Sequence, residues 1–207
     1  VNLGYQSYFV STIAIEMLKG MNFDVVRLGD LKADFQEVEP VMRNTDFLSF
    51  DISAIQFAYA EANVYNSPNG LNGEEACKIM RYAGVSDKLS SVGLFEYNQE
   101  LDVNNQTAQL LAQMIWYFVD GYKMRKQELN PNLKNCMKYT VAFEDGKNEI
   151  IFYKSQSSGR WWMGVPFKKE GEKQLQNYFV ACSYRDYEMA NQGEVPERWL
   201  KTYNKFI

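Results

Sequence analysis

Over the first 126 residues, short β-rich apolar runs alternate with stretches in which apolar residues recur every three or four positions. This order predicts βαβ units around a parallel sheet. Strands are expected at residues 3–9, 24–28, 46–51 and 90–96. Helices are expected at residues 13–21, 31–42, 74–83 and 102–126. Pro40 is expected either to start a new turn or to kink the second helix, and Gly84 to end the third at positive φ.

The pattern changes after Asn130-Pro131-Asn132. Aromatic and β-branched runs then follow one another at residues 139–143, 149–154, 160–167 and 178–183, separated by glycine-containing segments at Asp145-Gly146, Ser158-Gly159 and Gly171. This spacing is typical of an antiparallel meander. Ser183 and Asp186 form the pattern of a capping box, and Pro196 is well placed to open a final helix.

These patterns predict an α/β protein in two parts. Residues 1–128 are expected to form an α/β domain with a parallel sheet, and residues 129–207 an antiparallel β extension with terminal helices. At 207 residues the chain is long enough to bury a substantial core. The extension is expected to cover an apolar face of the long helix at 102–126, because a small meander rich in aromatic residues is not stable alone.

Composition excludes several classes of function. The chain has no histidine, so Ser-His-Asp triads, Cys-His dyads and HExxH zinc sites are excluded within it. The net charge of −4 argues against nucleic acid as a partner. The three cysteines are widely spaced and no apolar stretch is long enough to span a membrane, so we expect a cytoplasmic protein without a membrane partner.

Candidate chemistry lies where the predicted strands end, because ligands of open parallel sheets bind beyond the carboxyl ends of the strands. Asp51 ends the third strand, and Glu96 and Asn98 end the fourth. Asp51 is followed by about twenty residues without clear periodicity, a loop length that is often functional. Asp51 could equally brace this loop. Cys77 lies within a helical pattern and is expected to be a core residue.

Three segments resemble a known family in order and spacing. They are Ser49-Phe50-Asp51-Ile52-Ser53-Ala54-Ile55-Gln56, Pro68-Asn69-Gly70-Leu71-Asn72-Gly73-Glu74-Glu75 and Phe95-Glu96-Tyr97-Asn98. Together they resemble the second half of the arginase/agmatinase/formimidoylglutamase (ureohydrolase) superfamily. The resemblance covers about residues 3–126 and implies a three-layer α/β/α half-domain with a parallel sheet.

The resemblance also implies roles for individual residues. Asp51 matches the first of two aspartates that bind a pair of manganese ions in the family. Glu75 matches the glutamate that holds the guanidinium or amidine of the substrate, so a small amidine or guanidino compound is the implied partner. Glu75 could instead be a surface residue favoured in the first turn of a helix.

Departures from the family pattern affect the metal site. Ser53 stands in place of the second aspartate, Gln56 in place of the third, and Phe57 in place of a proline. A neutral hydroxyl is a poor substitute for a bridging carboxylate between two divalent ions. The family's histidine ligands have no counterpart in this chain. We therefore expect a degenerate site and no manganese bound by this chain.

We therefore interpret the chain as a portion of a formimidoylglutamase-like hydrolase of linear amidines. This chain alone is expected to be inactive. Two alternatives stay open: a non-catalytic arginase-like pseudoenzyme, and an interaction or homo-oligomerisation module. The second would use the aromatic residues of the extension, Trp161, Trp162, Phe167 and Tyr178, as a partner surface. A core role for these aromatics is the competing interpretation.

Overall fold

A computed structural model describes residues 1–143, 148–168 and 175–206. The chain forms two compact units, Val1–Arg125 and Lys126–Ile207, and each is described by itself. No helix in the described part of the chain is long and apolar enough to cross a membrane.

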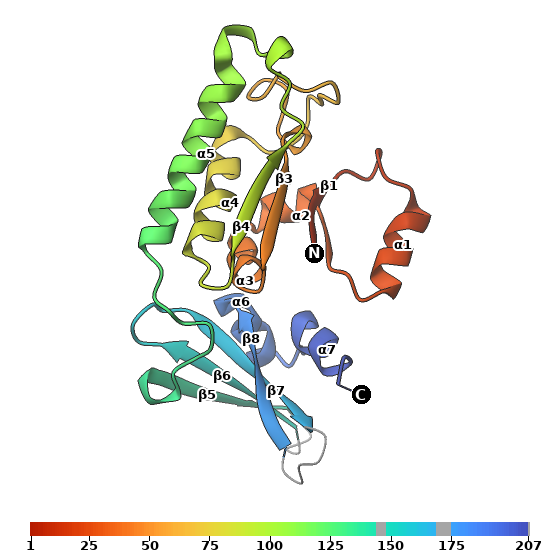
Figure 1. Cartoon of the computed structure of the whole chain (residues 1–207). Helices are drawn as coiled ribbons and strands as arrows, with labels where there is room; N and C mark the ends of the chain where they lie inside the picture. Colours follow the sequence, from red (N-terminus) through yellow and green to blue (C-terminus); the bar gives the residue numbers. More distant parts are fainter. Residues whose placement is uncertain (144–147, 169–174, 207) are drawn as a thin grey trace. The chain divides into compact units, whose positions relative to one another are not determined.

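The first unit alternates strands and helices, as the hydrophobic pattern predicts (Figure 1). Its strands are β1 (Asn2–Tyr5), β2 (Val25–Arg27), β3 (Phe47–Asp51) and β4 (Ser91–Phe95). Its helices are α1 (Thr12–Gly20), α2 (Leu28–Ala33), α3 (Val38–Arg43), α4 (Gly73–Val85) and α5 (Gln106–Lys123).

The four strands form two parallel pairs. β1 pairs with β2, and β3 pairs with β4 in a register that joins Phe47 to Ser91 and Asp51 to Phe95. The prediction of parallel strands is confirmed, but within the described residues the two pairs are not hydrogen-bonded to each other. The sequence did not specify which strands are neighbours, because pairing depends on contacts between distant segments.

One helix expected from the sequence is broken, and another forms with its apolar side uncovered. The helix expected at 31–42 is broken at Asp34 into α2, a 3₁₀ turn and α3. Pro40 lies in the first turn of α3, where proline is tolerated, which agrees with the expectation that it starts a new turn. Helix α1 forms, but its apolar residues face outward: the exposed fractions of Ile13 and Met17 are 76% and 68%. Helical spacing identified α1 but could not show whether its apolar face is covered.

The core of the first unit lies between the strands and helices α3, α4 and α5. Its fully buried residues include Ile52, Ile55, Met80 and Met114. Gly84 lies inside α4 and does not have positive φ, so the prediction that it ends the helix is wrong. It is instead needed because α5 passes so close that a Cβ at Gly84 would overlap the carbonyl oxygen of Phe118.

The second unit is a four-stranded antiparallel meander with two helices (Figure 1). Strands β5 (Cys136–Ala142), β6 (Glu149–Ser155), β7 (Trp161–Lys168) and β8 (Leu175–Cys182) pair in sequence order, which confirms the prediction. Gly159 has positive φ (73°) in the turn before β7, whereas Asp145-Gly146 and Gly171 lie outside the described residues. Helices α6 (Tyr184–Asn191) and α7 (Glu197–Tyr203) follow.

The second unit has a hydrophobic core of its own. Phe152, Met163 and Val165 are fully buried in the sheet, and Trp199 and Tyr203 of α7 pack against this cluster. The indole of Trp199 donates a hydrogen bond to the carbonyl of Gly164 at 3.0 Å. The helices of the second unit therefore cover part of the meander. The expectation that the extension covers the helix at 102–126 stays a prediction.

Candidate functional site

The carboxyl end of β3 carries the first predicted site residue. Asp51 is exposed, and its carboxylate accepts a hydrogen bond from the backbone N–H of Ser53 at 2.8 Å. This bond caps the 3₁₀ turn Ile52–Ala54, which leads the chain out of the strand. Asp51 thus braces the beginning of the loop, which is the structural role that the sequence left open for it.

Glu75 has two well-defined partners at the beginning of α4. Its Oε2 accepts the N–H of Asn72 at 2.8 Å, while the side chain of Asn72 accepts the N–H of Glu75 at 2.8 Å, which completes a capping box. The same Oε2 lies 3.0 Å from Nζ of Lys32 in α2. The carboxylate is largely buried, with 17% of the side chain exposed.

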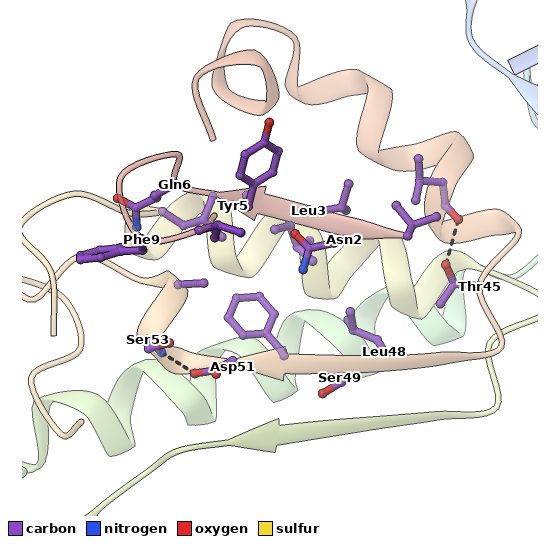
Figure 2. Close-up of a pocket in the computed structure, with 18 of the residues that line it drawn as sticks. Asn2, Leu3, Tyr5, Gln6, Phe9, Thr45, Leu48, Ser49, Asp51 and Ser53 are labelled. Atoms are coloured by element: carbon purple, nitrogen blue, oxygen red, sulfur yellow. Dashed lines mark hydrogen bonds between the residues drawn. The ribbon is translucent and has the colours of Figure 1, made fainter. Parts of the chain in front are cut away.

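Asp51 lines a pocket of about 790 Å³ that does not include Glu75 among its lining residues. Figure 2 shows Asp51 and Ser53 at one end of this pocket, near Gln6 and Phe9, which follow β1. The pocket therefore does not bring together Asp51 and Glu75, the two residues to which the family resemblance gives roles. Gln6 was missed by sequence reasoning, because the first strand was expected to continue to residue 9, whereas β1 ends at Tyr5.

The other predicted strand-end residues support the loop that follows β3. Glu96 has a left-handed backbone (φ 69°), and its carbonyl accepts the side-chain amide of Asn63 at 2.9 Å. Asn98 donates its N–H to the carbonyl of Ala62 at 2.9 Å. Asn63 is 1% exposed and joins the loop to the end of β4, a role that no sequence pattern indicated.

Backbone contacts close the loop that follows β3. Ile55 and Gln56 form isolated parallel bridges with Leu71 and Ser67. A Cβ at Gly70 would lie 2.6 Å from the carbonyl oxygen of Ala54, so only glycine allows this approach. The twenty-residue stretch without periodicity is thus held by backbone contacts between its two ends.

The residues present do not fit a dinuclear manganese centre. Manganese takes anionic oxygen or imidazole ligands, and two ions need several such groups around them. Within the described residues, no group of three or more His, Cys, Asp or Glu side chains is placed to hold a metal ion. The one carboxylate at the end of β3, Asp51, already accepts the N–H of Ser53.

Cys77 is a core residue, as the sequence predicted. It is 5% exposed in α4. Burial raises the pKa of the Cys77 thiol, and the negative charge of Glu74 raises it further. A thiol with a raised pKa is a poor nucleophile at neutral pH.

Comparison with solved structures defines the fold class of the first unit. In solved structures, the chain resembles formiminoglutamase from Trypanosoma cruzi with a TM-score of 0.56 and 16% identity, covering 60% of this chain and 44% of that one. It resembles formimidoylglutamase from Bacillus subtilis with a TM-score of 0.54 and 20% identity, covering 59% and 41%. A further structure of the T. cruzi protein contains Mn²⁺. These likenesses establish an arginase-type α/β fold.

A family model for the arginase family matches residues 4–120. The chain belongs to the arginase family. It spans less than half the length of the solved relatives. A search of curated proteins finds no match.

Proposed function

We propose that this chain is a portion of a formimidoylglutamase-like protein that retains the amidine-binding fold but does not by itself carry out metal-dependent hydrolysis. One observation carries the proposal. At the end of β3, where the family places paired metal aspartates, the chain has Asp51 engaged as a cap and Ser53 as the second residue. A hydroxyl cannot offset the charge of two divalent ions.

Calorimetric titration of Mn²⁺ into the full chain tests this proposal. We expect no stoichiometric site tighter than the millimolar range, because isolated exposed carboxylates bind divalent ions weakly. The T. cruzi formiminoglutamase, which has been crystallised with Mn²⁺, serves as the positive control. A stoichiometric site of micromolar affinity, about 8 kcal/mol, would overturn the proposal.

A hydrolysis assay with formimidoylglutamate provides an independent measurement. We expect no turnover by the chain above the rate of the uncatalysed reaction, with or without added Mn²⁺. The double variant S53D/Q56D restores the family's carboxylates at both replaced positions. Weak Mn²⁺ binding gained by this variant, absent from the natural chain, would support the role assigned to the two replacements.

Glu75 is proposed to contact the amidine or guanidinium group of a ligand. A carboxylate can accept two N–H bonds from such a planar cation. In this chain the carboxylate already has a cationic partner, Lys32, at 3.0 Å, so a ligand would have to displace it. Of the four aromatics that the interaction-module alternative would use, Trp161 and Trp162 are buried, at 8% and 2% exposed, which favours a core role for them. Phe167 is partly buried and Tyr178 is 50% exposed, so a partner surface could use only these two of the four.

A further inference from the structure

The meander of the second unit has an open edge at β5. Its strands pair in the order β5, β6, β7 and β8, so β5 has a neighbouring strand on one side only (Figure 1). Among the residues that the structure describes, no backbone hydrogen bond joins another segment to the outer side of β5. The edge of a sheet offers a row of unpaired N–H and C=O groups, to which another strand can add.

Two hydrogen bonds at the ends of β5 fix which of its residues face this edge. The N–H of Phe143 donates to the carbonyl of Asn148 at 3.0 Å, and the carbonyl of Asn135 accepts the N–H of Gln156 at 3.0 Å. Both bonds join residues that lie opposite each other in the register of β5 and β6, so the odd-numbered residues of β5 bond to β6. The backbone groups of the even-numbered residues therefore point to the open edge. These outward-facing residues are Cys136, Lys138, Thr140 and Ala142.

The side chains of β5 set conditions on the strand that could pair with it. On one face, Val141 is buried in the core of the second unit, Tyr139 packs against that core, and Met137 is 40% exposed. The hydroxyl of Tyr139 lies 3.6 Å from Sδ of Met137 on the same face. The other face carries Lys138, the only charged residue of β5. Lysine on an edge strand opposes pairing, so a partner strand must match the apolar face and keep positive charge away from Lys138.

A second copy of β5 meets these conditions in one register. Two antiparallel copies exchange hydrogen bonds only where outward-facing residues lie opposite each other, so the twofold axis must pass through a residue and not between two residues. An axis at Lys138 would set the two lysines directly opposite each other, which is unfavourable. An axis at Thr140 would align only residues 138–142. An axis at Tyr139 aligns the whole of both strands and sets Lys138 of each copy opposite Thr140 of the other.

The register at Tyr139 also matches the apolar face of β5 with itself. Met137 of one copy lies opposite Val141 of the other, and the two Tyr139 side chains lie beside each other at the axis. These are the pairs without direct hydrogen bonds, in which opposite side chains approach most closely. The outward-facing residues of the two copies exchange about eight hydrogen bonds. Backbone, charge and apolar contacts are thus satisfied by the same alignment.

We propose that two copies of this chain associate through β5, antiparallel about a twofold axis at Tyr139, and so join their two four-stranded sheets into one. The contact uses the open β5 edge of both copies, so association through it stops at a dimer. One pair of strands buries a small area, so we expect a dissociation constant of about 10–100 μM. The surface lies outside residues 4–120, which match the arginase family, and the inference does not rest on the proposed lack of hydrolysis.

Charged substitutions at Thr140 test the register. In the dimer, Thr140→Glu creates two opposite-charge pairs with Lys138, so the dissociation constant of the full chain should fall about five- to tenfold, whereas Thr140→Lys creates two like-charge pairs and should raise it by a similar factor. Gln156→Glu and Gln156→Lys make the same changes of net charge at an exposed position after β6 and should have little effect. Sedimentation equilibrium measures all five proteins. Weaker dimerisation of Thr140→Glu, or equal effects at the two positions, would overturn the proposed register.

Amide exchange at single residues locates the contact. We expect the amides of Lys138 and Thr140 to exchange slowly in concentrated solution and quickly after dilution, while those of Tyr139 and Val141, which bond to β6, stay protected in both. Thr140→Pro removes an outward-facing N–H and should give a folded monomer, because an edge strand tolerates proline there.

Three results would overturn the proposal. The first is a chain that stays monomeric at about 500 μM, well above the expected dissociation constant. The second is a dimer in which the amides of Lys138 and Thr140 exchange as fast as in the monomer, since the contact would then use another surface. The third is protection of these amides at every concentration, which would show that another segment of the same chain covers the edge.

Discussion

Gly84 of α4 and Gly121 of α5 face each other where the two helices cross. A Cβ at Gly121 would lie 3.2 Å from the Cα of Gly84 and would overlap the carbonyl oxygen of Arg81. A Cβ at Gly84 would overlap the carbonyl of Phe118. The backbones of the two helices are therefore in direct contact, and each glycine is required by the other helix rather than by its own conformation.

Replacing Gly121 by alanine should destabilise the protein. The added methyl group meets backbone atoms that cannot move aside without separating α4 from α5, and overpacking of this kind costs about 1–3 kcal/mol. Gly29→Ala in α2 is the matched control, because nothing lies within 4 Å of its added Cβ. The control should be neutral or stabilising by up to about 1 kcal/mol. Urea unfolding of both variants measures the difference, and equal effects would contradict the close crossing.

Asp102 should make the stability of the first unit depend on acidic pH. Its carboxylate accepts the N–H groups of Thr107 and Ala108 at 2.8 and 2.9 Å and the hydroxyl of Tyr97 at 3.0 Å. Desolvation raises the pKa of Asp102, but hydrogen bonds from Ala108, Thr107 and Tyr97 outweigh it, so the pKa lies below its ordinary value. The carboxylate therefore stabilises the fold above its unfolded pKa, near 3.9, and this contribution is lost as the pH falls through the lower folded pKa.

The variant Asp102→Asn isolates this contribution. It keeps the size of the side chain but removes the charge, so its melting temperature should lie below that of the natural chain at pH 7. The difference should shrink as the pH falls and disappear in strong acid, where both side chains are neutral. A difference that stays constant with pH would show that the charge of Asp102 does not stabilise the beginning of α5.

How far the sequence specifies this structure depends on the range of the interaction. The meander from β5 to β8 and the capping box of Ser183 and Asp186 were predicted, because alternation and capping are local signals. The role of Gly84 was not, because it depends on a helix that begins more than twenty residues later. The pairing of the strands depends on distant contacts in the same way.

At the candidate site, too, the sequence predicted local features but not contacts between distant residues. The sequence placed Asp51 at a strand end and found the replaced aspartate at Ser53, since both are matters of order and spacing. It did not show that the carboxylate of Asp51 caps the next turn, or that Lys32 from α2 lies beside Glu75. Asn63 gave no signal at all, because a single asparagine in a loop has no pattern.

Asp186 should be essential for the second unit. It is 6% exposed, accepts the N–H of Ser183 at 2.8 Å and lies 3.2 Å from Nε of Arg198 in α7. It thus joins the beginning of α6 to α7. Asp186→Ala removes this buried carboxylate from its two partly exposed partners, which costs about 2–4 kcal/mol. Glu188→Ala, an exposed position on the same helix, should cost less than about 0.5 kcal/mol. Thermal unfolding of both variants provides the comparison.

Glu75 gives the most informative test of ligand binding, because its structural and functional roles predict different results. Both of its interactions, with the N–H of Asn72 and with Lys32, use Oε2. Glu75→Gln keeps an oxygen that can accept the N–H of Asn72 but loses the charge opposite Lys32. We expect a loss of stability of about 0.5–1 kcal/mol, since the ion pair is partly exposed.

Binding of an amidine should respond to Glu75 and Lys32 in opposite directions. If Glu75 holds the cationic group of a ligand, Glu75→Gln should weaken binding of formimidoylglutamate or L-arginine about tenfold or more, because a charge-assisted pair is lost. Lys32→Ala removes the competing cation and should strengthen binding. Glu74→Gln, at the exposed neighbouring position in the same turn, should leave the affinity unchanged. Calorimetry of the three variants distinguishes a ligand-binding role of Glu75 from a structural one. Equal affinities in all three variants would show that Glu75 acts only in the capping box and in the ion pair with Lys32.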